Sequence, residues 1–295
     1  MPRYAKFTVA VGRRQTGKSG KTLRMIFKAV TEQRRKALIF DAMNEYESYR
    51  MKENEPPIAI KAISYSSLDR FTLSQYPEVC RVCPVTDKGD RMGTDDLQKY
   101  LAYTLKHFKN GIMLVEDVNK FVSDNAPNDI IGSLATLRQA GVDLIMHFQM
   151  VQKAANPKIL GMANYIRLHK TNDEVYRFKD RFQDKTPIMM IAESIVNRRY
   201  DYGNSNNIDS EEGKFFSCVV DLDDFKIRGI FTRREAELGI QDYMNYNGGD
   251  AIKMLLNSRD RHGNYIWGAK NYAGAYAHLE KKLMQQYFVF NSSDK

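Results

Sequence analysis

The 295-residue chain contains few cysteines, a single tryptophan and no long hydrophobic run. Three cysteines in a chain of this length do not make a disulfide framework, which is typical of a protein from a reducing compartment. No run of about 18 or more apolar residues occurs, and the first residues lack the apolar stretch of a secretory signal. The sequence therefore predicts a soluble cytoplasmic protein without membrane insertion. Cys80 and Cys83 form one isolated CxxC pair, for which a core strand is favoured over a metal or redox site.

The charge balance is basic. The chain has 45 Lys and Arg against 36 Asp and Glu, a formal net charge of +9 at pH 7. Phosphate backbones attract such surfaces whatever their base sequence, so we expect nucleic acid as a partner. The alternative is a charge that only keeps the protein soluble, because the positive residues are scattered rather than gathered in a basic tail.

Over about the first 170 residues, short apolar runs alternate with amphipathic stretches, the pattern of a βαβ sheet with helices on its faces. The sequence therefore predicts an α/β fold. The predicted strands are Lys6–Val11, Ala37–Asp41, Ile58–Ile63, Val79–Val85, Ile112–Glu116, Val142–His147 and Tyr165–His169. The predicted helices are Lys18–Gln33, Leu97–Phe108, Ile130–Gln139 and Glu174–Phe182.

The pattern changes after about residue 200, where the polar stretch Asp201–Ser210 predicts a loop or a boundary. Beyond it, Phe215–Val220 and Lys226–Phe231 are expected to pair as a hairpin, and Tyr272–Phe288 is expected to be a closing helix. We therefore predict two domains. The first comprises residues 1–199, and the second, residues 200–295, is a C-terminal α+β appendage of unknown role.

One motif has a direct chemical meaning. Gly12–Ser19 reads GRRQTGKS and matches G-x-x-x-x-G-K-[ST], after an apolar strand and at the start of a helix. In such a loop the backbone N–H groups surround the β-phosphate, Lys18 reaches the β and γ oxygens, and Ser19 is a ligand of Mg²⁺. The motif predicts binding of ATP with Mg²⁺. The residues assigned to the nucleotide are Gly12, Thr16, Gly17, Lys18, Ser19 and Gly20.

Two adjacent acids follow another apolar strand. Ile112–Val115 is succeeded by Glu116 and Asp117, which has the form of a Walker B strand with the usual Asp-Glu order reversed. By position, Glu116 is expected to hold the Mg²⁺ shell and Asp117 to polarise the attacking water, although the shorter Asp side chain needs a water or a shifted backbone to reach. The alternative is a strand that ends in two solvated acids.

Gln149 follows the strand Val142–His147 and is the candidate contact for the γ-phosphate or the attacking water, because strand ends line the site of a parallel sheet. Its neighbour His147 is expected to be an ordinary packed or surface histidine.

These pieces, in this order, resemble the HerA–FtsK superfamily of ring-forming DNA motors, which includes packaging ATPases of several viruses. The resemblance covers about residues 5–170. Besides the two Walker motifs it rests on Asp41 followed by Glu45 and Tyr46, on the segment Arg138–Gln149, and on Asn164–His169 as the next strand.

The resemblance implies a RecA-like P-loop NTPase core, a ring that is usually a hexamer, and ATP sites at the subunit interfaces. In such rings an arginine from the neighbouring copy stabilises charge in the transition state. Arg138 is the first candidate for that role, with Arg177 and Arg181 behind it. For each of them the alternative is a solvated helix charge.

The favoured function is an ATP-hydrolysing DNA translocase, and within that class a viral genome-packaging motor. It would act in the host cytoplasm or with the virion, on double-stranded DNA, as a homo-oligomeric ring and with a capsid or portal component as a possible partner. Lys153, Lys158 and Lys170 beside the last core strand are candidate DNA contacts, with ordinary surface charge as the alternative. A small P-loop kinase or transferase and a nucleotide-binding assembly protein with little turnover are the competing hypotheses.

Overall fold

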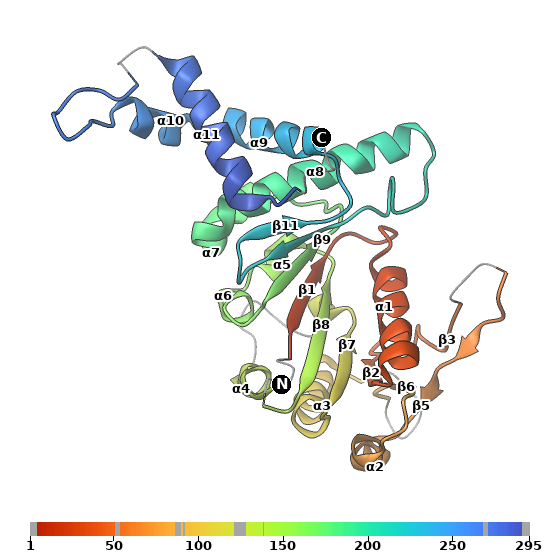
Figure 1. Cartoon of the computed structure of the whole chain (residues 1–295). Coiled ribbons are helices and arrows are strands. Elements are labelled where there is room, and N and C mark those ends of the chain that lie inside the picture. The colour runs from red at the N-terminus through yellow and green to blue at the C-terminus, as the bar shows by residue number, and fades with distance from the viewer. Residues whose placement is uncertain are drawn as a thin grey trace. The chain divides into compact units, whose positions relative to one another are not determined.

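A computed structural model describes residues 5–50, 54–85, 90, 92–120, 128–137, 139–267 and 271–290 (Figure 1). Contacts divide the chain into two compact units, Met1–Asp173 and Glu174–Lys295. The predicted domain boundary between residues 199 and 200 lies within helix α8 (Thr186–Ser205), and the division into 1–199 and 200–295 stays a prediction. Among the described helices, none is long and apolar enough to cross a membrane.

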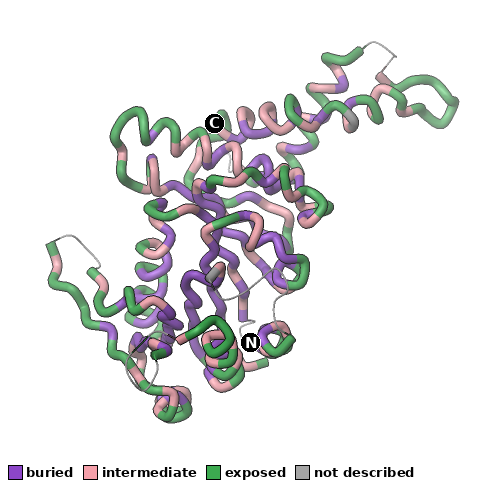
Figure 2. The backbone as a smooth tube through the Cα atoms, turned by 180° about the vertical axis from the view of Figure 1, so that it is seen from behind, coloured by how far each residue is buried: buried purple, intermediate pink, exposed green. Residues whose placement is uncertain are grey.

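A parallel sheet forms the centre of the first unit. Its strands lie side by side in the order β9-β1-β8-β7-β2-β6-β5, and every pair in this series is parallel. Strands β2, β7 and β8 are buried along their whole length, as expected for parallel strands covered on both faces (Figure 2). The bounds are β1 Phe7–Val11, β2 Lys36–Phe40, β5 Lys61–Ala62, β6 Val79–Val82, β7 Gly111–Val115, β8 Val142–Phe148 and β9 Tyr165–Leu168.

Helices cover this sheet, and α1 (Lys18–Gln33) is the one that matters for the site. Its apolar residues Leu23, Ile26, Phe27 and Val30 follow helical spacing and are buried against side chains of the central strands. The other helices are α2 Leu68–Leu73, α3 Thr94–His107, α4 Asn128–Thr136, α5 Val151–Ala154 and α6 Pro157–Leu160. The α/β prediction is confirmed, and α1 has the predicted bounds.

The predicted strand Ile58–Ile63 is two short strands. β4 (Ile58–Ala59) pairs with β3 (Ser48–Tyr49) outside the main sheet, whereas β5 pairs with β6. Cys80 is buried on β6, whereas Cys83 follows the strand and is half-buried, and neither forms a disulfide with another described cysteine. The interpretation of the CxxC pair as part of a core strand therefore agrees with the structure.

The second unit combines helices with one hairpin, in agreement with the predicted α+β appendage. β10 and β11 pair antiparallel across the predicted turn, and the closing helix α11 begins at the predicted residue. The long α8 packs on α9, which starts with a capping box formed by Thr232 and Glu235. The bounds are α7 Lys179–Phe182, α8 Thr186–Ser205, β10 Cys218–Asp221, β11 Lys226–Arg228, α9 Arg233–Asn247, α10 Gly249–Leu256 and α11 Tyr272–Tyr287.

Two predictions in this region were wrong. The stretch Asp201–Ser210 is not a loop throughout, because α8 continues to Ser205. Gly203 is buried there, and a Cβ atom on it would lie 2.5 Å from the backbone nitrogen of Lys214. This glycine permits close packing of two backbones and does not mark a turn. The predicted helix Glu174–Phe182 is a 3₁₀ turn, Val175–Phe178, followed by the single turn of α7.

We expect Gly203→Ala to lower the free energy of unfolding by about 1–3 kcal/mol, because the new methyl group meets rigid backbone. The intrinsic preference of a helix for Ala over Gly, about 0.5–1 kcal/mol, opposes this loss and is smaller. Gly249→Ala is the matched control, since nothing lies within 4 Å of its Cβ position. Urea unfolding followed by circular dichroism measures both. Equal stability of the two variants would contradict the packing role of Gly203.

Candidate functional site

The loop between β1 and α1 is held at both of its sides. The backbone N–H of Gly12 donates to Phe148 O at 3.1 Å, and that of Arg13 donates to Lys170 O at 2.8 Å. A Cβ atom on Gly12 would lie 2.5 Å from His169 Cβ, so only glycine fits this close approach. Gly17 has a φ of 79°, in the left-handed region that glycine adopts without strain. The two glycines thus allow a tight loop that is bonded to the backbone at the ends of β8 and β9.

His169 supports the loop from beneath. Its ring is fully buried, and burial lowers its pKa well below the usual value, so the imidazole is neutral. Nδ1 lies 2.8 Å from Thr16 O, and because a carbonyl only accepts, this nitrogen carries the proton. Thr16 in turn donates its hydroxyl proton to Arg13 O at 2.9 Å. The loop is therefore braced internally as well as by the strands.

Lys18 lies inside the loop. Its Nζ donates to the carbonyl oxygens of Gly12 and Arg13, the latter at 2.9 Å. Burial lowers the pKa of Lys18 to about 8, against the opposing effect of the carboxylates of Glu116 and Asp117. At neutral pH the group is still an ammonium, so a buried positive charge lies inside the loop.

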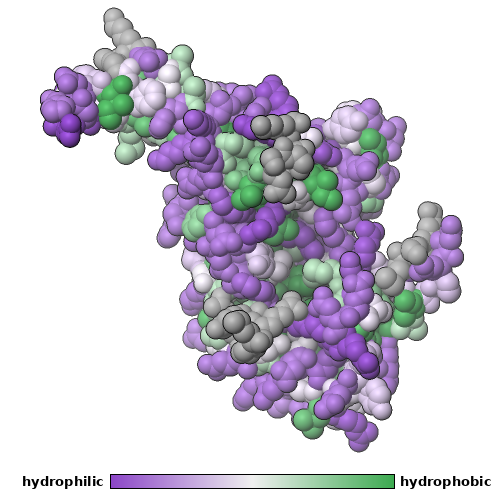
Figure 3. Space-filling model, in the orientation of Figure 1, coloured by the Kyte–Doolittle hydropathy of each residue, from purple (hydrophilic) through white to green (hydrophobic). Residues whose placement is uncertain are grey.

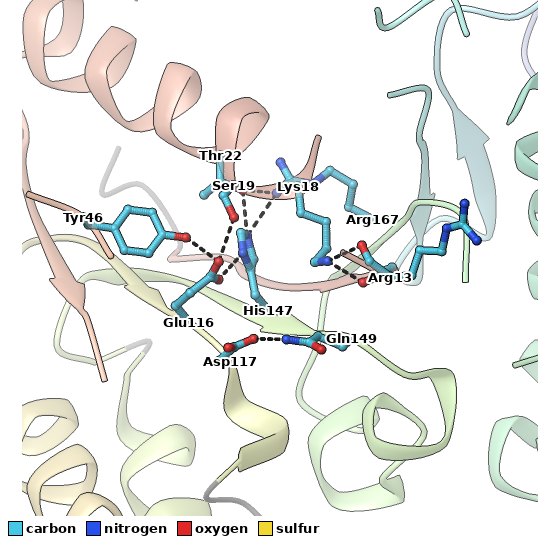
Figure 4. A network of polar contacts seen from close by, with 11 residues as sticks. Arg13, Lys18, Ser19, Thr22, Tyr46, Glu116, Asp117, His147, Gln149 and Arg167 are labelled. Carbon is cyan, nitrogen blue, oxygen red and sulfur yellow. Dashed lines mark hydrogen bonds and ion pairs between the residues drawn. The ribbon is translucent and has the colours of Figure 1, made fainter. Parts of the chain in front are cut away.

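Glu116, immediately after β7, is contacted at both carboxylate oxygens (Figure 4). Ser19 Oγ donates to Oε1 at 2.7 Å, Tyr46 donates its hydroxyl proton to the same oxygen, and His147 Nδ1 contacts Oε2. Burial alone would raise the pKa of Glu116, but His147 and the two hydroxyl donors outweigh it and lower the pKa to about 2. Glu116 is therefore an ionised carboxylate in a fixed orientation.

Further polar contacts hold His147 on the side of its ring that faces away from Glu116. Burial lowers the pKa of His147, so its ring is neutral and Nδ1–H faces Glu116 while Nε2 accepts. Thr22 Oγ1 lies 2.8 Å from Nε2 and donates to it, and Arg167 donates to Thr22 Oγ1. These contacts run from β9 through α1 and β8 to the end of β7, where His147 Nδ1 lies close to Glu116 Oε2 without the geometry of a hydrogen bond. Figure 4 shows these side chains around the start of α1.

Asp117 and Gln149 form a second pair at the ends of neighbouring strands. Gln149 Nε2 donates to Asp117 Oδ1, and Asp117 has a left-handed backbone with φ of 50°. These residues border a pocket of about 340 Å³, within the size range of small-molecule sites. The residues that line it are Arg14, Gln15, Thr16, Gly17, Lys18, Ser19, Gly20, Glu45, Glu116, Asp117 and Gln149.

The structure therefore brings most of the predicted site residues around one pocket, with Gly12 at the base of the loop. Arg138 lies outside the described residues. Arg177 and Arg181 belong to the second unit, where Arg177 is exposed and pairs with Glu174 of its own segment. Their predicted roles stay predictions.

The donor set fits a hard cation carried by phosphates. Ser19 and Glu116 offer oxygen ligands, and Mg²⁺ usually takes one or two protein oxygens together with substrate phosphates and water. Among the described residues, no group of three or more His, Cys, Asp or Glu could hold a metal by itself. The arrangement suits an ion that arrives with a nucleotide rather than a permanent metal centre.

Sequence reasoning missed several members of this network. His147 is packed, as expected, but it also contacts Glu116. Thr22, Tyr46 and Arg167 were not assigned to the site, although the last two lie in segments that carry the family resemblance. The roles of Thr22 and Arg167 depend on β1 lying between β8 and β9, and that of Tyr46 depends on β2 lying beside β7. The sequence pattern reveals neither neighbour relation.

No protein-family model matches the chain, and no curated protein matches it. Among solved structures, it is similar to the genome packaging NTPase B204 of Sulfolobus turreted icosahedral virus 2 in complex with AMP. The identity is 16%, the TM-score is 0.47, and the match covers 76% of this chain and 96% of that chain.

A structure of B204, the DNA-packaging ATPase from Sulfolobus turreted icosahedral virus, matches at 14% identity and a TM-score of 0.46, over 76% and 95% of the two chains. The N-terminal domain of zonular occludens toxin from Neisseria meningitidis matches at 12% identity and a TM-score of 0.32, over 58% of this chain and 79% of that one.

We expect Gly12→Ala to weaken nucleotide binding at least about 10-fold, because the methyl group forces His169 or the loop to move and misplaces N–H groups that need near-ideal geometry. Gly132→Ala in α4 is the control, since nothing lies within 4 Å of its Cβ position. Titration with a fluorescent ATP analogue measures both. If Gly12→Ala binds as tightly as Gly132→Ala, the loop is not the binding element.

Proposed function

We propose that this protein is an ATPase that binds ATP with Mg²⁺ on the loop Gly12–Gly20 and hydrolyses it with the acids that follow β7. The observation that carries the proposal is the contact between Ser19 and the ionised Glu116, 2.7 Å apart, beside the buried ammonium of Lys18. A hydroxyl and a carboxylate in contact, next to a fixed positive charge, suit a phosphate-bound magnesium ion.

Each residue has a distinct part in this mechanism. The loop N–H groups and Lys18 bind the phosphate oxygens, and Ser19 and Glu116 hold the Mg²⁺ shell. When bound there, the ion would supply neutralisation of the phosphate charge. Asp117 orients the attacking water and receives its proton, while Gln149 fixes the Asp117 carboxylate.

The reversed acid order is compatible with this assignment. A short Asp side chain at the second position needs a shifted backbone to reach a water, and Asp117 has such a backbone, with a φ of 50°. A non-Gly residue in the left-handed region is uncommon and costs free energy, so its presence at the pocket supports a functional reason.

A small kinase fits less well. A transferase of this class requires a lid of arginines over an acceptor, and Arg14 is the one arginine among the described residues that line the pocket. A nucleotide-binding assembly protein with little turnover is the second candidate, favoured by the unusual order of Glu116 and Asp117 and by the contact of Gln149 with the latter.

The proposed partner is DNA, and the distribution of charge supports it. Residues 1–173 contain 27 Lys and Arg against 18 Asp and Glu, whereas residues 174–295 contain 18 of each. The whole formal excess of +9 therefore belongs to the unit that holds the pocket. A polyanion attracted to this unit would lie close to the site of hydrolysis. The face in Figure 3 is mostly hydrophilic, with hydrophobic residues in small separate groups.

We further propose a ring of identical copies that translocates double-stranded DNA, in the manner of a viral packaging motor, with an arginine donated between copies. Lys170 supports this coupling, because its carbonyl oxygen accepts the hydrogen bond from Arg13 in the phosphate loop. If the Lys170 side chain contacts DNA, a single backbone hydrogen bond connects that residue to the phosphate loop. Lys153 on α5 and the exposed Lys158 on α6 are further candidates.

We expect Asp117→Asn to bind ATP within about threefold of wild type but to lose at least about 100-fold in kcat, the usual contribution of a general base. Lys18→Ala is expected to lose binding itself. Equilibrium binding and phosphate release distinguish the two losses. Wild-type turnover in Lys18→Ala would refute the assignment of the loop, whereas tight binding without any wild-type turnover would favour the assembly protein.

Double-stranded DNA is expected to raise ATP turnover several-fold at low salt. This stimulation should fall steeply between about 50 and 200 mM salt, because counterion release governs phosphate contacts. Lys170→Gln is expected to weaken the stimulation without changing turnover in the absence of DNA. Light scattering in the same buffers measures the particle size. A monomer whose hydrolysis ignores DNA would rule out the motor.

A further inference from the structure

Tyr46 lies between β2 and β3, and its hydroxyl approaches Glu116 from the side opposite His147 (Figure 4). Its ring is buried, with only 5% of the residue exposed, and belongs to the hydrophobic cluster formed by α1 and the central strands. Its hydroxyl is placed differently, because it donates to Glu116 Oε1, the same oxygen that Ser19 contacts. A buried tyrosine hydroxyl usually finds a hydrogen-bond partner, and here that partner is a carboxylate that lines the pocket.

The backbone of Tyr46 is fixed by a buried carboxylate. Asp41, which directly follows β2, is fully buried and accepts the N–H of Glu45 on Oδ1 at 2.9 Å and the N–H of Tyr46 on Oδ2 at 3.0 Å. Arg81 on the neighbouring β6 pairs with Oδ2 at 3.0 Å and also donates to Asn44 Oδ1. The turn from residue 41 to residue 46 is therefore closed on itself and anchored to the sheet.

We infer that Tyr46 is a positioning residue for magnesium binding, which holds the Glu116 carboxylate in the orientation that the ion requires, and that the Asp41–Arg81 pair acts through it. This inference rests on the proposed function, because it assigns Glu116 to the Mg²⁺ shell. The glutamate side chain has three rotatable bonds, and two hydroxyl donors on one oxygen restrict them. Groups that hydrogen-bond to a metal-binding side chain typically change metal affinity by about 10–100-fold.

The chemistry of the donor supports this role. The Tyr46 hydroxyl is buried against Glu116, and because an ionised carboxylate only accepts, the phenol is the donor in this contact. Ser19 Oγ can offer a lone pair to the ion while its proton still points at Glu116. Tyr46 then supplies the second hydrogen bond to Glu116 Oε1. Unlike Ser19, it is not itself proposed as a ligand of the ion.

The test is Tyr46→Phe, which removes the hydroxyl and keeps the buried ring. A fluorescent, non-hydrolysable ATP analogue is titrated in EDTA and then across a Mg²⁺ series. We expect the affinity in EDTA to stay within about twofold of wild type, and the Mg²⁺ concentration at half-saturation to rise about 10-fold. Tyr287→Phe is the matched control, because Tyr287 is as buried, at 4% exposed, and lies in the second unit. It should change neither quantity.

A Mg²⁺ half-saturation within twofold of wild type would overturn the inference. A loss of affinity in EDTA as large as the loss in Mg²⁺, together with a larger fall in Tm than Tyr287→Phe shows, would also overturn it. That pattern is expected of a residue that only stabilises the core. In turnover assays, kcat of Tyr46→Phe should fall at low Mg²⁺ and recover at high Mg²⁺, with KM for ATP unchanged at saturating Mg²⁺.

The outcome separates this inference from the proposed function. Wild-type protein that binds the analogue in a Mg²⁺-dependent way but never hydrolyses ATP contradicts the ATPase, yet a raised Mg²⁺ requirement in Tyr46→Phe still supports the positioning role. Wild-type binding that ignores Mg²⁺ refutes the role of Glu116 and, with it, this inference.

Asp41→Asn tests whether the Asp41–Arg81 pair acts through Tyr46. We expect it to raise the Mg²⁺ requirement as Tyr46→Phe does, and the double variant to show no further rise, since the two residues act through one contact. Fully additive effects would show that Asp41 does not act through Tyr46. If Asp41→Asn fails to fold, the Tyr46→Phe titration alone decides the main inference.

Discussion

The buried carboxylate of Glu116 is the group on which the organisation of this site depends. A negative charge removed from water is costly unless it is paired or hydrogen-bonded, and here the contacts come from several separate parts of the fold. Ser19 belongs to the start of α1, Tyr46 to the turn after β2, and His147 to β8. The chain must bring all of them together in order to bury one charge. The result is an oxygen ligand that is ionised and oriented within the folded protein.

Electrostatics also divides the molecule at a larger scale. The unit with the pocket has all the net positive charge, and the second unit is formally neutral. The basic residues near the pocket have different tasks, since Lys18 lies within the loop and Arg167 is buried and donates to Thr22 Oγ1. Buried cations of this kind organise the site rather than attract a partner. The exposed lysines and arginines of the same unit are the ones that the proposed nucleic-acid partner would contact.

Local sequence was sufficient to predict the loop and its immediate surroundings. The spacing of Gly12, Gly17, Lys18 and Ser19 encodes a backbone shape, and the apolar spacing of α1 encodes the face it buries, so both were predicted with the correct bounds. The adjacent acids were placed correctly because a strand end is a local feature. These parts depend on a few consecutive residues.

The roles of the other residues depend on which segments are neighbours in the fold. Nothing local shows that His147 and Arg167 lie on either side of β1 and meet Thr22 on the helix that follows it. The same limitation applies to Gly203, which resembles a turn residue until Lys214 is known to pack on it. Such residues take their roles from contacts between segments far apart in the chain, and composition or periodicity does not encode those contacts.

The end of the first unit is bonded to both edges of the pocket. Lys170 O accepts from Arg13 in the phosphate loop, His169 contacts Thr16 O, and Asp173 accepts the N–H groups of Val151 and Gln152, just beyond Gln149. Residues 169–173 therefore connect the loop between β1 and α1 to the segment that follows Gln149. A movement of residues 169–173 must either break these hydrogen bonds or move both edges of the pocket. The segment through which the chain leaves the first unit therefore joins the two edges of the pocket, and displacing it would strain both edges together.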